Sequence, residues 1–172
     1  MITLFQIDKS GRDIFEKDYA IVIIVDKKEV YGVNLSQDIR DNILHDFRSG
    51  ELNIKKEDEK MNRTRLRIRF HTAVIVLLLK RIISKTKLAE KVNIEICNDF
   101  DGHFHEIKDM IYKHICQIVN TLKPEDIVLS KFYKPSLIDT SAQAVREREY
   151  HKISNFSLID LDYNSIKEVV RK

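Results

Sequence analysis

The chain has 172 residues, of which 43% are hydrophobic and 33% charged, so it can bury the core of one domain of ordinary size. This composition excludes an intrinsically disordered chain, and the formal net charge of +3 permits nucleic-acid binding without requiring it. We therefore expect residues 1–172 to form a single folded domain.

The apolar segments are too short for a membrane protein. The longest, residues 73–79, falls well below the length of a membrane-spanning helix, and the N-terminal residues show no signal-peptide pattern. Cys97 and Cys116 lie in or beside apolar runs, which is typical of buried free thiols in a reducing compartment. The sequence therefore predicts a cytoplasmic protein with no membrane partner.

The first third of the chain predicts a meander of strands followed by a helix. Residues 2–7 form a short strand ending at Asp8, and residues 19–25 are nearly all apolar, as in a strand covered on both faces. A polar turn leads into a third strand at residues 30–35. Ser36 then caps a helix with apolar residues at helical spacing, and Gly50 ends it.

Residues 51–62 are highly charged, which indicates a solvated, mobile connection. The segment that follows is ambiguous, because alternate residues in it are arginines. These are Arg63, Arg65, Arg67 and Arg69. The alternation is strand periodicity, whereas residues 70–84 have the pattern of a largely buried helix. The region is either one long helix or a strand running into a helix, and we favour the helix.

The second half alternates between strands and helices. Strands are predicted at residues 92–97 and 127–132, helices at 104–122 and 136–150, and an extended piece and a short helix at 156–161 and 164–170. A meander followed by this alternation predicts an α/β fold with a mixed sheet and helices on both faces.

Aspartates lie where the chain must turn in separate parts of the sequence: Asp8, Asp99, Asp101 and Asp139. Carboxylates from separate elements can converge on divalent ions such as Mg²⁺ or Mn²⁺, which bridge a scissile phosphate and activate water. Each also has a structural explanation. Asp8 could begin a turn, Asp101 could cap a helix, and Asp139 lies at capping-box spacing from Ser136.

These segments also resemble a known family. Residues 8–12, Asp-Lys-Ser-Gly-Arg, resemble the Asp-Glu-Ala-Gly-Arg opening of type 2 ribonuclease H and the Asp-Glu-Ser-Gly opening of uncharacterised ribonuclease H-like families. Residues 99–102, Asp-Phe-Asp-Gly, resemble the Asp-Gly turn after the fourth strand of type 2 enzymes. Residues 141–149 resemble their late Ser-Ala-rich helix. The predicted succession of elements is also that of the ribonuclease H fold.

The resemblance implies a ribonuclease H-like fold and a metal-dependent endonuclease that hydrolyses nucleic-acid phosphodiester bonds. Asp8, Asp139 and either Asp101 or Asp99 would hold Mg²⁺ or Mn²⁺. The sequence departs from the family at Lys9, where the relatives have a glutamate that a lysine cannot replace as a ligand. Glu95 is the nearest carboxylate on the sheet that could substitute for this glutamate. On an extended strand, however, it would lie about 13 Å from Asp99, too far for both residues to hold one metal ion.

Lys9 therefore favours an alternative, a catalytically inactive ribonuclease H-like domain that binds nucleic acid or a protein partner. A third interpretation is an unrelated α/β fold in which the aspartates only cap helices and form turns.

The histidines form a rival constellation for Zn²⁺ or Mn²⁺, made of Asp101, His103, His105 and Glu106. Residues two apart on a helix do not face each other, so the two histidines would converge only if the segment were extended.

The arginine-rich segment is the candidate surface for RNA, DNA or a hybrid of the two. If Arg63–Arg69 is extended, its arginines form one basic ribbon that contacts phosphates. If it is helical, they spread around the helix.

Overall fold

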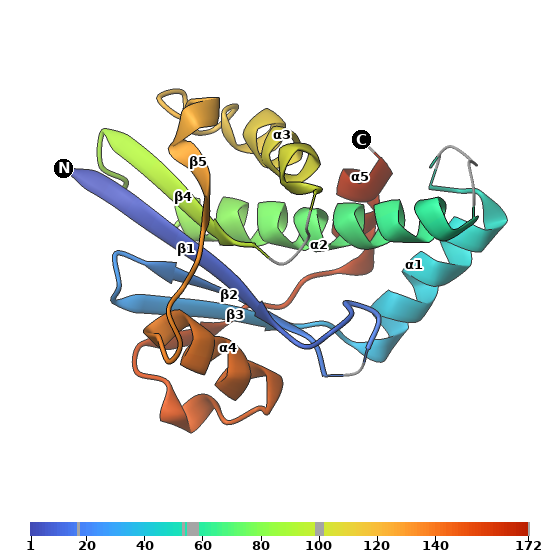
Figure 1. Ribbon diagram of the computed structural model, residues 1–172, viewed down its shortest axis with the longest axis horizontal. Helices are drawn as coiled ribbons and strands as arrows, with labels where there is room; N and C mark the ends of the chain where they lie inside the picture. The colour runs from blue at the N-terminus through green and yellow to red at the C-terminus, as the bar shows by residue number, and fades with distance from the viewer. Residues whose placement is uncertain (17, 53, 55–58, 99–101, 172) are drawn as a thin grey trace.

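The computed structural model describes residues 1–16, 18–52, 54, 59–98 and 102–171 of the chain, with the backbone alone for residues 59–61. Figure 1 shows the arrangement of its elements. The strands are β1 (Ile2–Ser10), β2 (Ala20–Val25), β3 (Glu29–Asn34), β4 (Lys91–Cys97), β5 (Ile127–Ser130) and β6 (Phe156–Leu158). The helices are α1 (Gln37–Ser49), α2 (Glu59–Ile83), α3 (Phe104–Ile115), α4 (Leu137–Arg146) and α5 (Tyr163–Arg171).

The strands of the described chain form one mixed sheet in the order β5-β4-β1-β2-β3-β6. β2 is antiparallel to β1 and β3, whereas β4 is parallel to β1, β5 to β4 and β6 to β3. Helix α4 packs on one face of the sheet, and α2 and α3 pack on the other (Figure 1). The prediction of an α/β fold with a mixed sheet is confirmed in this general form.

The meander at the start of the sheet follows the prediction, with shifted boundaries. All residues of β2 are buried, because α2 covers one face of this strand and α4 the other. The predicted end of the first strand at Ile7 is wrong, since the next three residues also pair with β2 and extend β1 to Ser10. Asp8 therefore lies inside a strand and does not begin a turn.

Helix α1 begins and ends as its local sequence predicts. The Oγ of Ser36 accepts a hydrogen bond of 3.3 Å from the backbone N–H of Ile39. At the other end Gly50 has the left-handed φ of +82°, and its backbone N–H donates a hydrogen bond to the carbonyl oxygen of Phe47. Both boundaries follow from single residues that satisfy backbone groups at the helix ends.

The arginine-rich segment lies within α2, so the helical alternative is the one that the structure contains. The helix begins at Glu59, inside the stretch 51–62 that was predicted as a solvated connection, and Leu52 is also buried. The charged composition of this stretch therefore gave the wrong boundary. No helix of the described residues has both the length and the hydropathy needed to cross a membrane.

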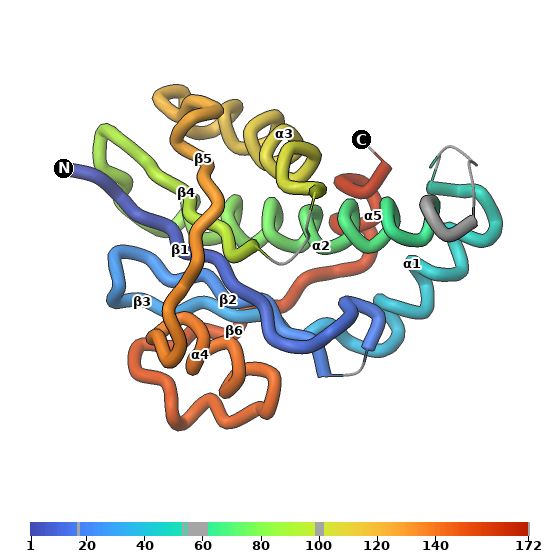
Figure 2. The backbone as a smooth tube through the Cα atoms, viewed as in Figure 1, coloured from blue at the N-terminus to red at the C-terminus, as the bar shows by residue number. Residues whose placement is uncertain are grey.

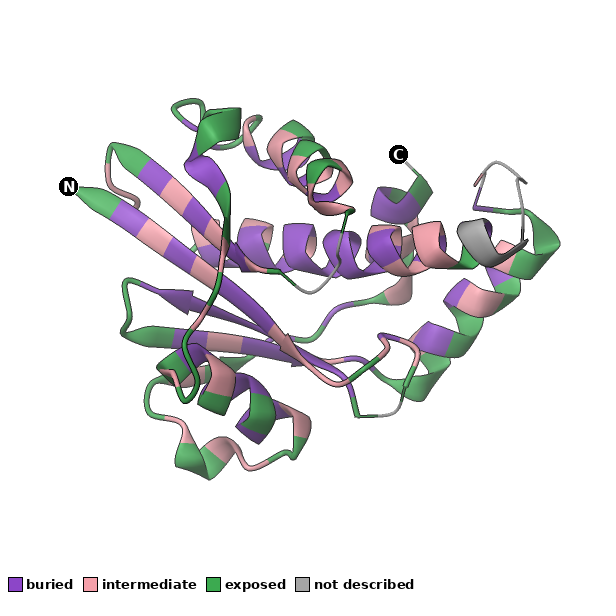
Figure 3. Cartoon of the chain, viewed as in Figure 1, coloured by how far each residue is buried: buried purple, intermediate pink, exposed green. Residues whose placement is uncertain are grey.

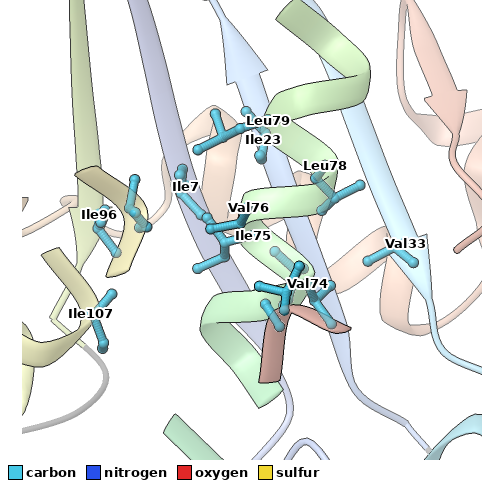
Figure 4. Packing of buried hydrophobic residues seen from close by; sticks show 14 of the residues in the cluster. Ile7, Ile23, Val33, Val74, Ile75, Val76, Leu78, Leu79, Ile96 and Ile107 are labelled. Atoms are coloured by element: carbon cyan, nitrogen blue, oxygen red, sulfur yellow. The ribbon is translucent and has the colours of Figure 1, made fainter. Parts of the chain in front are cut away.

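The main core lies between α2 and the sheet. The buried part of α2 extends along most of its length in Figure 3. Figure 4 shows Ile7 and Ile23 of the sheet facing Ile75, Val76 and Leu79 of the helix. These side chains belong to one continuous cluster that also includes residues of α3 and α5.

A smaller core lies beneath α4 on the opposite face. It consists of Ala20, Val22, Ile24, Val30, Ile138, Ala142 and Val145. Helix α4 ends at Arg146, short of the predicted boundary at residue 150, because Arg148 adopts a left-handed φ of +62°. Figure 2 follows the chain from α4 onward to β6 at the edge of the sheet.

Helix α3 is also shorter than predicted, ending at Ile115 and not at residue 122. The apolar spacing continues past its end, and Val119 and Leu122 are buried in the turns that follow. In this segment the spacing predicted which side chains are buried, but not the conformation that buries them.

Candidate functional site

Asp8 lies on β1 with its side chain on the face of the sheet that α4 covers. It pairs across the strands with Val22, which belongs to the small core under α4. Asp8 is only 7% exposed, and its Oδ1 accepts a hydrogen bond of 2.8 Å from the backbone N–H of Lys9. The strand therefore fixes this carboxylate in position near the end of β1.

Lys9 points to the opposite face, because successive residues of a strand alternate. Its Nζ donates a hydrogen bond of 3.2 Å to the carbonyl oxygen of Gly11 and lies 5.8 Å from the centre of the Tyr19 ring. On this side the Tyr19 hydroxyl is hydrogen-bonded to Nδ1 of His71, at 2.7 Å. Burial, assisted by the charge of Lys9, lowers the pKa of His71 to about 3. The sheet thus separates the Lys9 ammonium group from the Asp8 carboxylate.

Asp139 lies in the first turn of α4. The predicted cap is present, since the Oγ of Ser136 accepts a hydrogen bond of 3.3 Å from the backbone N–H of Asp139. The Asp139 side chain contacts a lysine: its Oδ1 lies 3.3 Å from Nζ of Lys134. The cap at Ser136 fixes where α4 begins and so where this carboxylate lies.

Lys134 forms an ion pair with Asp139. Its pKa is raised, chiefly by the hydrogen bond and charge of Asp139, and the charges of Asp8 and Cys97 add to the effect. Both aspartates also lie on the face of the sheet that α4 covers, because α4 packs on β1 and β2 and Asp8 pairs with Val22 on that face. The structure therefore places Asp8 and Asp139 on the same side of the sheet, while the carboxylate cluster itself stays a prediction.

Asp99 and Asp101, the candidates from the connection after β4, lie outside the described residues. The strand before them ends at Cys97, and the parallel register of β1 and β4 pairs Ile96 with Ile7, the residues that precede Cys97 and Asp8. Cys97 is a half-buried free thiol, more exposed than predicted. In the described part of the chain, no group of three or more His, Cys, Asp or Glu side chains is arranged to hold a metal ion.

The histidines of the rival constellation contact different partners along α3. Nδ1 of His103 lies 3.9 Å from Oε2 of Glu106, and Nε2 of His105 lies 3.4 Å from Oδ2 of Asp109. His105 is within the helix and His103 is at its N-cap. The segment is therefore not extended over these residues, which was the condition for the two histidines to converge.

The arginines of α2 do not form a ribbon, because the segment is helical. Arg63 is exposed, whereas the other three are half-buried. Arg67 forms an ion pair with Asp13, and Nη1 of Arg69 donates a hydrogen bond of 3.5 Å to the carbonyl oxygen of Val170. At least two of the four candidates for phosphate contact therefore bind other parts of the fold.

The connection between β5 and α4 was missed as a candidate surface. The predicted strand at 127–132 ends at Ser130, so Lys131, Tyr133 and Lys134 lie in the connection and are exposed. Aromatic residues between two lysines and followed by a proline were the available signal. The lysine that contacts Asp139 comes from this segment.

Comparison of the chain with protein-family models, with curated proteins and with solved structures gives no match. The function has to be argued from the site itself. Its central feature is a pair of carboxylates, Asp8 and Asp139, that come from separate elements and lie on one side of the sheet, with Lys134 paired to Asp139.

Proposed function

We propose that the protein is a metal-dependent nuclease of the ribonuclease H-like class, which hydrolyses phosphodiester bonds of nucleic acid. The observation that supports this most is that Asp8 on β1 and Asp139 in the first turn of α4, a helix that packs on β1, lie on the same side of the sheet. The succession of a three-stranded meander and alternating helices and strands agrees with the resemblance of residues 8–12 to the ribonuclease H opening.

The described donors suit a hard divalent ion. Asp8 and Asp139 offer carboxylate oxygens, and Mg²⁺ takes oxygen ligands while keeping several of its own waters. These two residues would hold Mg²⁺ or Mn²⁺, together with Asp101 or Asp99, as the family resemblance implies. The bound ion would supply an activated water and stabilise charge on the phosphate.

The residues of the chain prepare the site in different ways. The strand fixes the buried Asp8 carboxylate, and the Ser136 cap fixes the start of the helix that bears Asp139. Lys134 neutralises part of the charge of Asp139 and is 80% exposed, so its flexible side chain can leave Asp139 when a cation binds.

The alternative is a catalytically inactive domain of the same class that binds nucleic acid or a protein partner. The ion pair of Lys134 with Asp139 favours it, because a lysine then serves as the permanent cation of the site. The replacement of the family glutamate by Lys9 favours it as well.

The deciding experiment is cleavage of end-labelled single-stranded, duplex and RNA–DNA hybrid substrates with Mg²⁺ or Mn²⁺. The variants are Asp8→Asn and Asp139→Asn, with Asp41→Asn on the remote helix α1 as the matched control. Metal-dependent cleavage that is lost in both site variants and kept in the control supports the nuclease. No cleavage by the folded natural chain refutes it and leaves the inactive domain.

A further inference from the structure

The connection between β5 and α4 exposes an aromatic ring between positive charges. Tyr133 is 90% exposed, and Lys131 and Lys134 on either side are exposed as well. Phe132 points inward and packs against the small core under α4. The inward Phe132 anchors the segment, so the Tyr133 ring is presented to the solvent from a fixed backbone.

This ring lies next to the carboxylate pair. The connection passes in front of β1 on its way to α4 in Figure 1. Lys134, the residue after Tyr133, has its Nζ 3.3 Å from Oδ1 of Asp139. A molecule bound at the carboxylates is therefore within reach of the Tyr133 ring.

A hollow continues the surface beyond the start of α4. A cavity of about 710 Å³ lies between this helix and the β2–β3 turn, and its lining includes Leu137, Thr140, Lys27 and Lys28. Its volume is within the range of about 300–1,000 Å³ that small-molecule sites occupy. Leu137 is 53% exposed, and both lysines are exposed at the tip of the turn. The cavity lining also includes Glu147 and Glu149, so the surface from Tyr133 to the turn combines exposed apolar side chains, ammonium groups and two carboxylates.

We propose that this surface binds a single-stranded nucleic acid, with an unpaired base stacked on Tyr133 and phosphates near Lys131 and the lysines of the turn. The inference rests on the proposed function and names the form of substrate that the site takes. A polyanion with flat bases matches both properties of the surface, its lysines and its exposed ring. A base inside a duplex is already covered on both faces, so only an unpaired base offers a face to the ring.

The test is fluorescence anisotropy of a labelled 12-nucleotide oligothymidylate with the full chain in EDTA, which separates binding from cleavage. Tyr133→Ala should weaken binding about 5- to 100-fold, the loss typical of one base–aromatic stack. Tyr133→Phe keeps the ring and should bind within about twofold of the natural chain, since stacking needs only the aromatic face. Lys131→Ala should lower the slope of log Kd against log salt by about 0.7.

Leu158→Ala and Lys85→Ala are the matched controls, because both side chains are exposed on other parts of the surface. Neither should change the affinity. The inference is overturned if Tyr133→Ala binds as the natural chain does, if a 12-base-pair duplex binds as tightly as the single strand, or if no nucleic acid binds.

The same variants separate this inference from the nuclease. Binding that depends on Tyr133, in a chain that cleaves no substrate, supports the single-strand surface and refutes the nuclease. Cleavage that depends on Asp8, with binding and KM indifferent to Tyr133, supports the nuclease and overturns the single-strand surface.

Discussion

His71 should make the protein less stable as the pH falls below about 7. The side chain is 3% exposed within α2, its Nδ1 is hydrogen-bonded to the Tyr19 hydroxyl, and burial lowers its pKa to about 3. A histidine of the unfolded chain has a pKa of about 6.5. The unfolded chain therefore binds a proton at pH values where the folded chain does not, and acid favours unfolding.

The size of the effect follows from these two pKa values. At pH values between these two pKa values, each unit by which the pH is lowered reduces the free energy of unfolding by about 1.4 kcal/mol. Acidification from pH 7 to pH 5 should therefore remove about 2 kcal/mol through His71 alone. The measurement is urea unfolding at both pH values for the natural chain and for His71→Gln, whose amide can still bond to Tyr19 but does not titrate.

The natural chain should lose about 2 kcal/mol more than His71→Gln over this interval. His151→Gln, which replaces an exposed histidine, controls for the loss of an imidazole as such. Equal pH dependence in the natural chain and in His71→Gln would refute the argument, because it would mean that the imidazole protonates equally well in both states.

Further substitutions test the site and the packing around it. Lys134→Ala removes the cation that competes for Asp139, so calorimetry should show Mn²⁺ binding tighter by about 1.5- to 5-fold, the value of an exposed ion pair. Unchanged affinity would show that Asp139 is not a ligand. Gly32→Ala places a methyl group 2.9 Å from the Phe156 ring, and this overpacking should cost about 1–3 kcal/mol in urea unfolding. Gly50→Ala meets no neighbouring atom but keeps the left-handed φ of +82°, so it should cost about 1 kcal/mol. If Gly32→Ala cost no more than Gly50→Ala, the contact with Phe156 would not be tight in solution.

The sequence predicted best those features that depend on neighbouring residues. Ser36 marks the start of α1 and Gly50 its end, and Ser136 marks the start of α4, because each of these residues satisfies backbone groups about one turn away. The buried β2 was evident from its unbroken apolar run. Such features are local and need no knowledge of the partner strands.

Features that depend on distant partners were predicted less well. The sequence could not reveal that β4 pairs with β1, which pairs Ile96 with Ile7, the residue before Asp8. It placed Asp8 at a strand end, because the pairing that extends β1 to Ser10 involves another strand. It also gave no sign that Lys9 and Asp8 are separated by the sheet, since that conclusion requires knowing that both lie within one strand.

The unequal cores on the two faces of the sheet have a consequence for motion. Helix α4 rests on a small cluster, while α2, α3 and α5 share a continuous and much larger one. Free energies of local opening follow the apolar contacts that must be broken, so α4 should open as a separate cooperative unit while the rest stays folded. Amide hydrogens of α4 should then exchange faster than those of α2. Asp139 and Tyr133 would move with this unit and Asp8 would not, so each opening would take apart the carboxylate pair and each closing would rebuild it.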